Sequence, residues 1–94
     1  MKPLHRQQVA KPGKIDQLIK ELKTLKASAD GDAEPGTLRF DILRAGDKIC
    51  VVEKYTNAAA IYVHVGTQAF KDYQDRVGGL IVEGSESSVF WDSA

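Results

Sequence analysis

The chain has 94 residues, 43% hydrophobic and 28% charged, which is typical of one small globular domain spanning residues 1–94. Lys and Arg together number 13, as do Asp and Glu, so no basic surface for nucleic acid or an anionic membrane is expected. One cysteine excludes an internal disulfide, and without a secretory signal or an apolar run of roughly 18 residues we expect a cytoplasmic protein.

The N-terminal part predicts a strand followed by a helix. Residues 4–10 carry few apolar side chains before the Pro12-Gly13 turn signal, so we expect a strand at an edge or interface. From Lys14 the spacing becomes helical, and residues 28–36 contain the turn formers that end the helix. The predicted buried stripe of this helix comprises Ile15, Leu18, Ile19, Leu22 and Leu25.

Two segments separated by a short glycine-containing connection predict a β-hairpin. In residues 37–44, Leu38, Phe40 and Ile42 alternate with polar side chains, as expected of a strand with one buried face. Residues 48–55 form the second strand. The period of two places Glu53 on the same face as Ile49, Val51 and Tyr55.

The C-terminal part predicts two short helices and a last strand. Asn57 is a good N-cap for a helix ending near Val65, and Thr67 caps a second helix. Residues 87–92 read as a short strand. The resulting order is that of an α+β, ferredoxin-like (split βαβ) antiparallel sheet with helices on one face. Because the other sheet face then lacks cover, we expect a homodimer.

Several motifs occur together in the order found in one family. Glu34-Pro35-Gly36 precedes a strand, Glu53-x-Tyr55 ends the next one, and His64 is followed by Phe70 and Tyr73. This set resembles the antibiotic biosynthesis monooxygenase family of dimeric α/β barrels. The resemblance implies a homodimer that oxidises a small aromatic phenol, hydroquinone or anthrone with O2 and needs no cofactor.

The residues suggest how that chemistry would work. An imidazole changes charge near neutral pH, so His64 could remove a proton from a phenol or an anthrone carbon. Glu53, on an apolar strand face, could accept a phenol proton or orient His64. The catalytic candidates are therefore His64 and Glu53. The competing interpretation is that His64 is a helix-end residue and that Glu53 pairs with the next helix or a base such as Arg39.

Five aromatic side chains could line a pocket for a flat aromatic substrate: Phe40, Tyr55, Phe70, Tyr73 and Trp91. At least Phe40 and Phe70 must also belong to the core of so small a domain. The two histidines are far apart in the sequence, so no metal site is expected. No glycine-rich phosphate loop occurs, so no nucleotide or flavin cofactor is expected. The alternatives are a non-catalytic dimer that binds a small molecule, and an isomerase of a small oxygenated metabolite.

Overall fold

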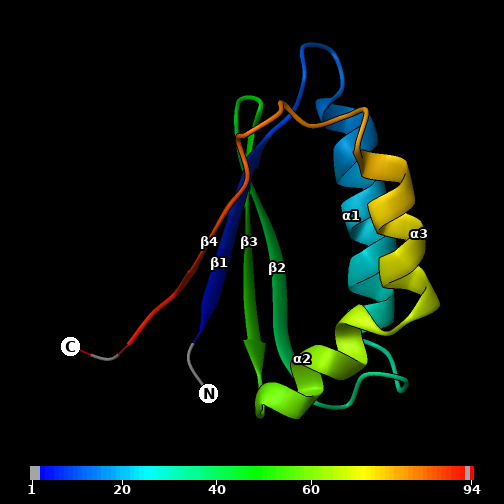
Figure 1. Ribbon diagram of the computed structural model, residues 1–94, viewed down its shortest axis with the longest axis vertical. Helices are drawn as coiled ribbons and strands as arrows, with labels where there is room; N and C mark the ends of the chain where they lie inside the picture. Colours follow the sequence, from blue (N-terminus) through cyan, green and yellow to red (C-terminus); the bar gives the residue numbers. More distant parts are fainter. Residues whose placement is uncertain (1–2, 93) are drawn as a thin grey trace.

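The computed structural model describes residues 3–92 and 94, and its elements follow the predicted order. The four strands pair antiparallel in one sheet with the order β2-β3-β1-β4, and the helices lie on one side of it (Figure 1). The predicted α+β, ferredoxin-like fold is therefore confirmed. The elements are β1 (Leu4–Val9), α1 (Ile15–Ala29), β2 (Thr37–Ala45), β3 (Lys48–Tyr55), α2 (Ala58–Val65), α3 (Gln68–Val77) and β4 (Ser87–Phe90).

β1 was predicted to lie at an edge of the sheet or at an interface, and the first of these two alternatives was wrong. β1 lies inside the sheet, between β3 and β4. Its helix-facing polar residues have partners within the protein: Arg6 pairs with Glu53, and Gln8 donates a hydrogen bond to Tyr73. A polar side chain with a buried partner costs far less to bury than an unpaired one. The low apolar content of this strand therefore did not mark an edge.

The predicted stripe of α1 packs on the sheet and forms part of the core. Ile15, Leu18, Leu22 and Leu25 are buried against Ile49 and Val51 of β3, while Ile19 is only partly buried. α3 adds Tyr73 and Val77 to the same cluster. Among the described residues, no helix is both long enough and apolar enough to cross a membrane.

The start of β2 departs from simple alternation. Thr37 pairs with Tyr55 and Arg39 pairs with the adjacent Lys54, so Leu38 is an extra residue in the ladder. Such a bulge changes the side to which the following side chains point. Leu38 is consequently exposed, whereas Phe40 is buried. The prediction that Leu38 shares the buried face with Phe40 and Ile42 was wrong for this reason.

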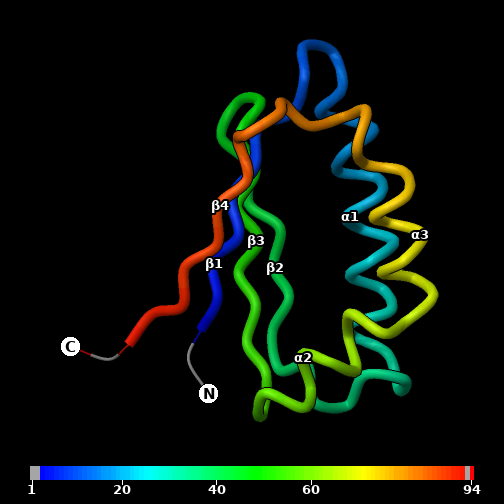
Figure 2. Tube along the Cα trace, in the orientation of Figure 1, coloured from blue at the N-terminus to red at the C-terminus, as the bar shows by residue number. Residues whose placement is uncertain are grey.

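The two short helices begin as their capping residues predicted. The side chain of Asn57 accepts a hydrogen bond from Ala60 N at 3.0 Å, and that of Thr67 accepts one from Phe70 N at 3.1 Å. Figure 2 shows α2 crossing the end of the sheet beside the connection between α1 and β2. This arrangement brings residues near 34 close to those near 64.

Gly36 is the point of closest approach between that connection and α2. A Cβ at this position would lie 2.6 Å from Ala60 Cβ and 3.0 Å from Thr56 Oγ1. We expect Gly36→Ala to lower the free energy of unfolding by about 1–3 kcal/mol, because backbone must move to admit the methyl group. Urea unfolding measures this. Gly79→Ala is the matched control, since nothing lies within 4 Å of its Cβ; equal costs for the two variants would contradict the expectation.

Candidate active site

A buried carboxylate–imidazole pair connects the α1–β2 connection to α2. Nδ1 of His64 hydrogen bonds to Oε1 of Glu34, and both residues are almost fully inaccessible, at 0% and 2% relative exposure. Oε2 of Glu34 accepts a hydrogen bond from the Ser28 hydroxyl at 2.6 Å. An ionised Glu34 can only accept in this bond, which then requires the proton on Nδ1 of His64. This bond fixes the orientation of the imidazole ring.

The other side of the imidazole faces aromatic rings. Nε2 of His64 is buried, and no partner for it lies within hydrogen-bond distance among the residues that the structure describes. The ring centroids of Phe40, Tyr55 and Phe70 lie 5.7, 5.8 and 5.3 Å from that of His64, with Phe70 edge-on. When Nδ1 carries the only proton, Nε2 presents a lone pair to an apolar environment. A lone pair in this position can accept a proton from an acidic group placed beside it.

Glu53 belongs to a second polar network on the same sheet face. The Tyr55 hydroxyl donates to its Oε1 at 2.5 Å, and Nη2 of Arg6 donates to the same atom at 3.4 Å. Nε of Arg6 lies 3.2 Å from Oε2 as an ion pair, without the geometry of a hydrogen bond. The carboxylate that contacts His64 is thus Glu34, while Glu53 holds Tyr55 and Arg6.

The buried phenols predict a loss of stability in alkali. Burial, reinforced by the charge of Glu53, raises the pKa of Tyr55 well above its usual 10.0, and burial also raises the pKa of Tyr73. Above pH 10 the unfolded chain loses these protons while the folded chain keeps them, so stability falls as pH rises. Each tyrosine contributes a slope of up to about 1.4 kcal/mol per pH unit.

Tyr55→Phe should therefore be less stable at neutral pH, because it loses the bond to Glu53, but should lose less stability per pH unit above pH 10. Urea unfolding between pH 8 and pH 11 measures both effects. Tyr62→Phe is the control, because Tyr62 is 74% exposed. Equal alkaline slopes for Tyr55→Phe and wild type would show that the Tyr55 proton does not stabilise the fold.

The structure brings most of the predicted site residues together. Phe40, Tyr55 and Phe70 surround His64, and Tyr73 adjoins Phe70 with ring centroids 6.4 Å apart. Trp91 lies elsewhere. Its ring packs on His5, 5.6 Å away, and His5 pairs with Val52 on the sheet face opposite to Glu53. Within one chain, Trp91 does not line the space around His64.

Sequence reasoning assigned no role to Glu34, Ser28 or Arg6. Glu34 was noted only as part of a Glu-Pro-Gly motif, and its partner lies 30 positions further along the chain. Arg6 lies in a strand with few apolar residues, so the sequence did not show that its side chain faces the helices. A buried histidine needs a hydrogen-bond partner. The set of family motifs that contains both Glu34 and His64 was the signal that could have suggested their hydrogen bond.

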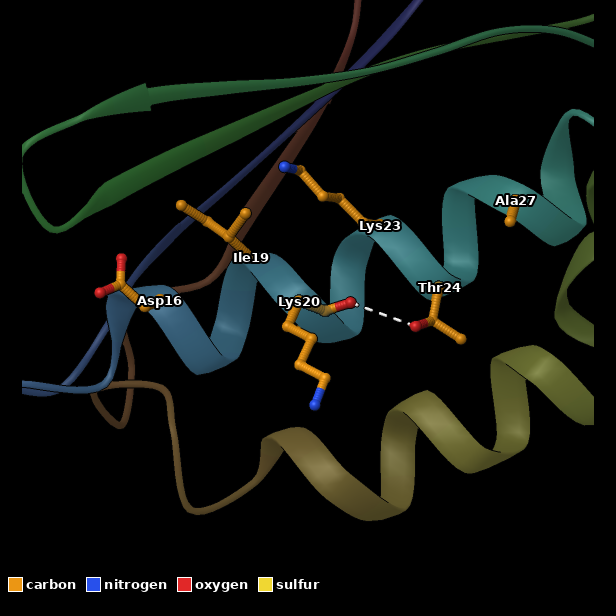
Figure 3. A pocket seen from close by; sticks show the side chains of 6 residues that line it. All are labelled: Asp16, Ile19, Lys20, Lys23, Thr24 and Ala27. Carbon is orange, nitrogen blue, oxygen red and sulfur yellow. Dashed lines mark hydrogen bonds between the residues drawn. The ribbon is translucent and has the colours of Figure 1, made fainter.

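A surface hollow of about 660 Å³ follows the solvent side of α1 and contains none of these groups. In Figure 3, Lys20 and Lys23 extend from α1 in different directions, and Thr24 donates a hydrogen bond to the Lys20 carbonyl oxygen at 3.2 Å. The remaining lining residues are Asp16, Ile19 and Ala27. Lysine side chains on a solvated helix face account for this hollow, so we assign no chemistry to it.

Comparison with known proteins supports the fold and the family. Solved structures of candidate antibiotic biosynthesis monooxygenases are similar over nearly the whole chain. The Nitrosomonas europaea protein has a TM-score of 0.85 at 21% identity, covering 99% of this chain and 98% of its own. The Caulobacter crescentus protein has 0.87 at 23% identity, with 98% and 88% covered. Sequence identities this low establish the fold alone. No curated protein matches the sequence.

The family itself is shown by sequence. The profile of the family described as antibiotic biosynthesis monooxygenase matches residues 5–76. That match includes both networks described above, from Arg6 to Tyr73, and confirms the resemblance carried by the Glu34, Glu53 and His64 motifs. The chain therefore belongs to the antibiotic biosynthesis monooxygenase family.

Proposed function

We propose that this chain is a homodimeric monooxygenase that oxidises a small aromatic phenol, hydroquinone or anthrone with O2 and uses no cofactor. The observation that carries the proposal is the environment of His64. One nitrogen is fixed by Glu34, and the other is a buried, unpartnered atom among three aromatic rings. An aromatic wall suits a flat substrate better than a sugar-like one. The family name agrees with an oxygenase and leaves the substrate open.

The proposed reaction begins with proton abstraction. Nε2 of His64 takes a proton from an acidic carbon or phenol, and Glu34 stabilises the imidazolium that forms. For an anthrone, the carbanion passes one electron to O2, and the two radicals combine to a peroxide that is reprotonated. Loss of the second C–H proton with O–O cleavage gives a ketone and water, so CH2 + O2 becomes C=O + H2O. The substrate supplies all the electrons.

Access to Nε2 is proposed to run past Phe70. His64 has no exposed surface, whereas Phe70 is only partly buried and meets the imidazole edge-on at 5.3 Å. Phe70 lies in the first turn of α3, directly after the Thr67 cap. A rotation of this ring would open a path from the surface to the imidazole. The substrate ring would then take the place of Phe70 against His64.

The proposed dimer covers the sheet face opposite to the helices. Register places Leu43, Val89 and their row neighbours on this face, and both are about half exposed, at 51% and 45%. Trp91, also half exposed, lies on the same side next to His5. Packing two such faces together would bury these side chains. Trp91 would then act at the interface and not at the aromatic wall of its own chain.

Oxygen uptake tests the proposed function. Purified, metal-free protein is mixed with anthrone or with a panel of hydroquinones, and O2 consumption is compared with the same mixture lacking protein. We expect uptake that is proportional to protein concentration, with one O2 consumed for each ketone formed. Absence of protein-dependent uptake across the panel would overturn the proposal of an oxygenase.

A second candidate is a dimer that binds an aromatic molecule without catalysis. The complete burial of His64 favours it, because a histidine with no exposed surface can act simply as the hydrogen-bond partner of Glu34. The two candidates differ in one outcome. A binding protein would hold an aromatic ligand without consuming O2. The isomerase alternative ranks lower, since the groups around His64 are aromatic rings and not a set of hydroxyls and bases.

A further inference from the structure

Part of the helix-facing side of the sheet remains open beside the aromatic cluster. Leu4 of β1 pairs with Phe90 of β4, and Arg6 pairs with Ser88, so these side chains share the face that carries Glu53. α3 reaches this face at β1, where Gln8 binds Tyr73. All four residues of β4 are nevertheless exposed, and Phe90 is 48% exposed. On this face Leu4 and Gln8 are buried, so the part open to a ligand is the strip formed by β4 and the Arg6 side chain beside it.

Arg6 is the cation on this strip. Its side chain is 27% exposed, while its partner Glu53 is 1% exposed, so this ion pair lies where the buried network meets the surface. Nη2 of Arg6 and the Tyr55 hydroxyl both donate to Oε1 of Glu53. The guanidinium consequently lies near the Tyr55 phenol, next to the aromatic wall of the candidate active site.

The guanidinium has hydrogen-bonding capacity left. Nε and Nη2 face Glu53, through an ion pair at 3.2 Å and a hydrogen bond at 3.4 Å. An arginine has five N–H donors, and no other acceptor for those of Arg6 is found in residues 3–92 and 94. The free edge contains Nη1 and the second N–H of Nη2. Two parallel N–H groups of this kind match the two oxygens of a carboxylate.

We propose that Arg6 is a specificity-determining residue that binds a carboxylate on the aromatic substrate. This inference rests on the proposed function, because it assumes that an aromatic ring lies near His64. It narrows the substrate class to hydroxylated aromatics that carry an acidic group. Glu53 would hold the guanidinium in place and leave its outer edge for the ligand. The competing interpretation makes Arg6 only the counter-ion of Glu53, and that interpretation predicts no preference for anionic ligands.

The test compares 2-naphthoate with 2-naphthol by calorimetric titration at pH 7, where the first is anionic and the second is neutral. We expect wild type to bind naphthoate about tenfold more tightly. Arg6→Gln alone would leave the Glu53 carboxylate buried without its counter-ion, so the decisive variant is Arg6→Gln/Glu53→Gln, which removes both charges. It should bind the two probes equally, because the tighter binding of naphthoate depends on the charge of Arg6.

Arg6→Lys is the second variant, because it keeps the charge but not the planar pair of donors; it should lose most of the preference. Arg39→Gln, on an exposed side chain paired with Asp41, is the control and should keep the preference. Equal binding of both probes by wild type, or a full preference in the double variant, would overturn the role of Arg6 while leaving the proposed function intact. Binding of neither probe would contradict the aromatic site itself, and with it both proposals.

Discussion

Replacing Glu34 by leucine should lower the free energy of unfolding by about 3–5 kcal/mol. Leucine fills a similar volume, so the loss comes from polarity and not from a cavity. Without the carboxylate, both nitrogens of His64 are buried and unpartnered, and the Ser28 hydroxyl loses its acceptor. Since small domains have a total stability of about 5–15 kcal/mol, this single change would leave a marginal protein.

Two comparisons separate this effect from a general intolerance of substitution. Ser28→Ala removes one half-buried hydrogen bond and should cost only about 1–2 kcal/mol. The double variant Glu34→Leu/His64→Phe removes both polar groups and should be more stable than Glu34→Leu alone. Urea unfolding followed by circular dichroism measures all three variants. If the double variant is the less stable one, the two residues are not energetically coupled as a pair.

Local pattern predicted the elements well because each pattern has a local cause. The bounds of β3 (Lys48–Tyr55) were predicted correctly, since Gly46 marks the turn and the period of two is unbroken. Asn57 and Thr67 cap the helices that they were expected to cap. These signals act over a few residues. They require no knowledge of what lies across the fold.

Errors arose where distant residues decide the outcome. β1 was predicted to lie at an edge or an interface because its polar side chains were counted without their partners, Glu53 and Tyr73. Leu38 was expected to be buried because it alternates with Phe40 and Ile42 in the sequence. A β-bulge breaks this alternation and leaves no obvious mark in the sequence. In both cases the pairing of one strand with another determined which side chains are buried.

The candidate site shows the same division. Glu53 was correctly placed on an apolar face, but its contact with Arg6 spans 47 positions and could not be read from spacing. His64 was expected at the end of a helix and lies in the last turn of α2, but its packing against Phe40 and Phe70 also removes it from solvent entirely. Residue types therefore identified the chemical groups. The tertiary fold decided which carboxylate meets the imidazole.

Because Glu34 contacts His64 and Glu53 contacts Tyr55 and Arg6, substitution of each glutamate should change a different kinetic parameter. Glu34 orients and stabilises the imidazole, so Glu34→Gln, which keeps the shape and an acceptor for Nδ1–H, should reduce kcat and leave KM nearly unchanged. Glu53 contacts Arg6, the proposed carboxylate-binding residue, and Tyr55 of the aromatic wall, so its removal should chiefly raise KM. If Glu34 and Glu53 acted in one network, each substitution would change kcat and KM together.

The largest expected effect on activity belongs to His64. His64→Gln retains an N–H donor for Glu34 and a similar length, but it has no basic atom. We therefore expect oxygen uptake with the best substrate to fall by about 10²–10⁴-fold, with a smaller loss of stability than Glu34→Leu shows. A folded His64→Gln protein that keeps uptake within about twofold of wild type would show that His64 is not the base. The Glu34–His64 pair would then be a structural contact that fixes α2 against the sheet.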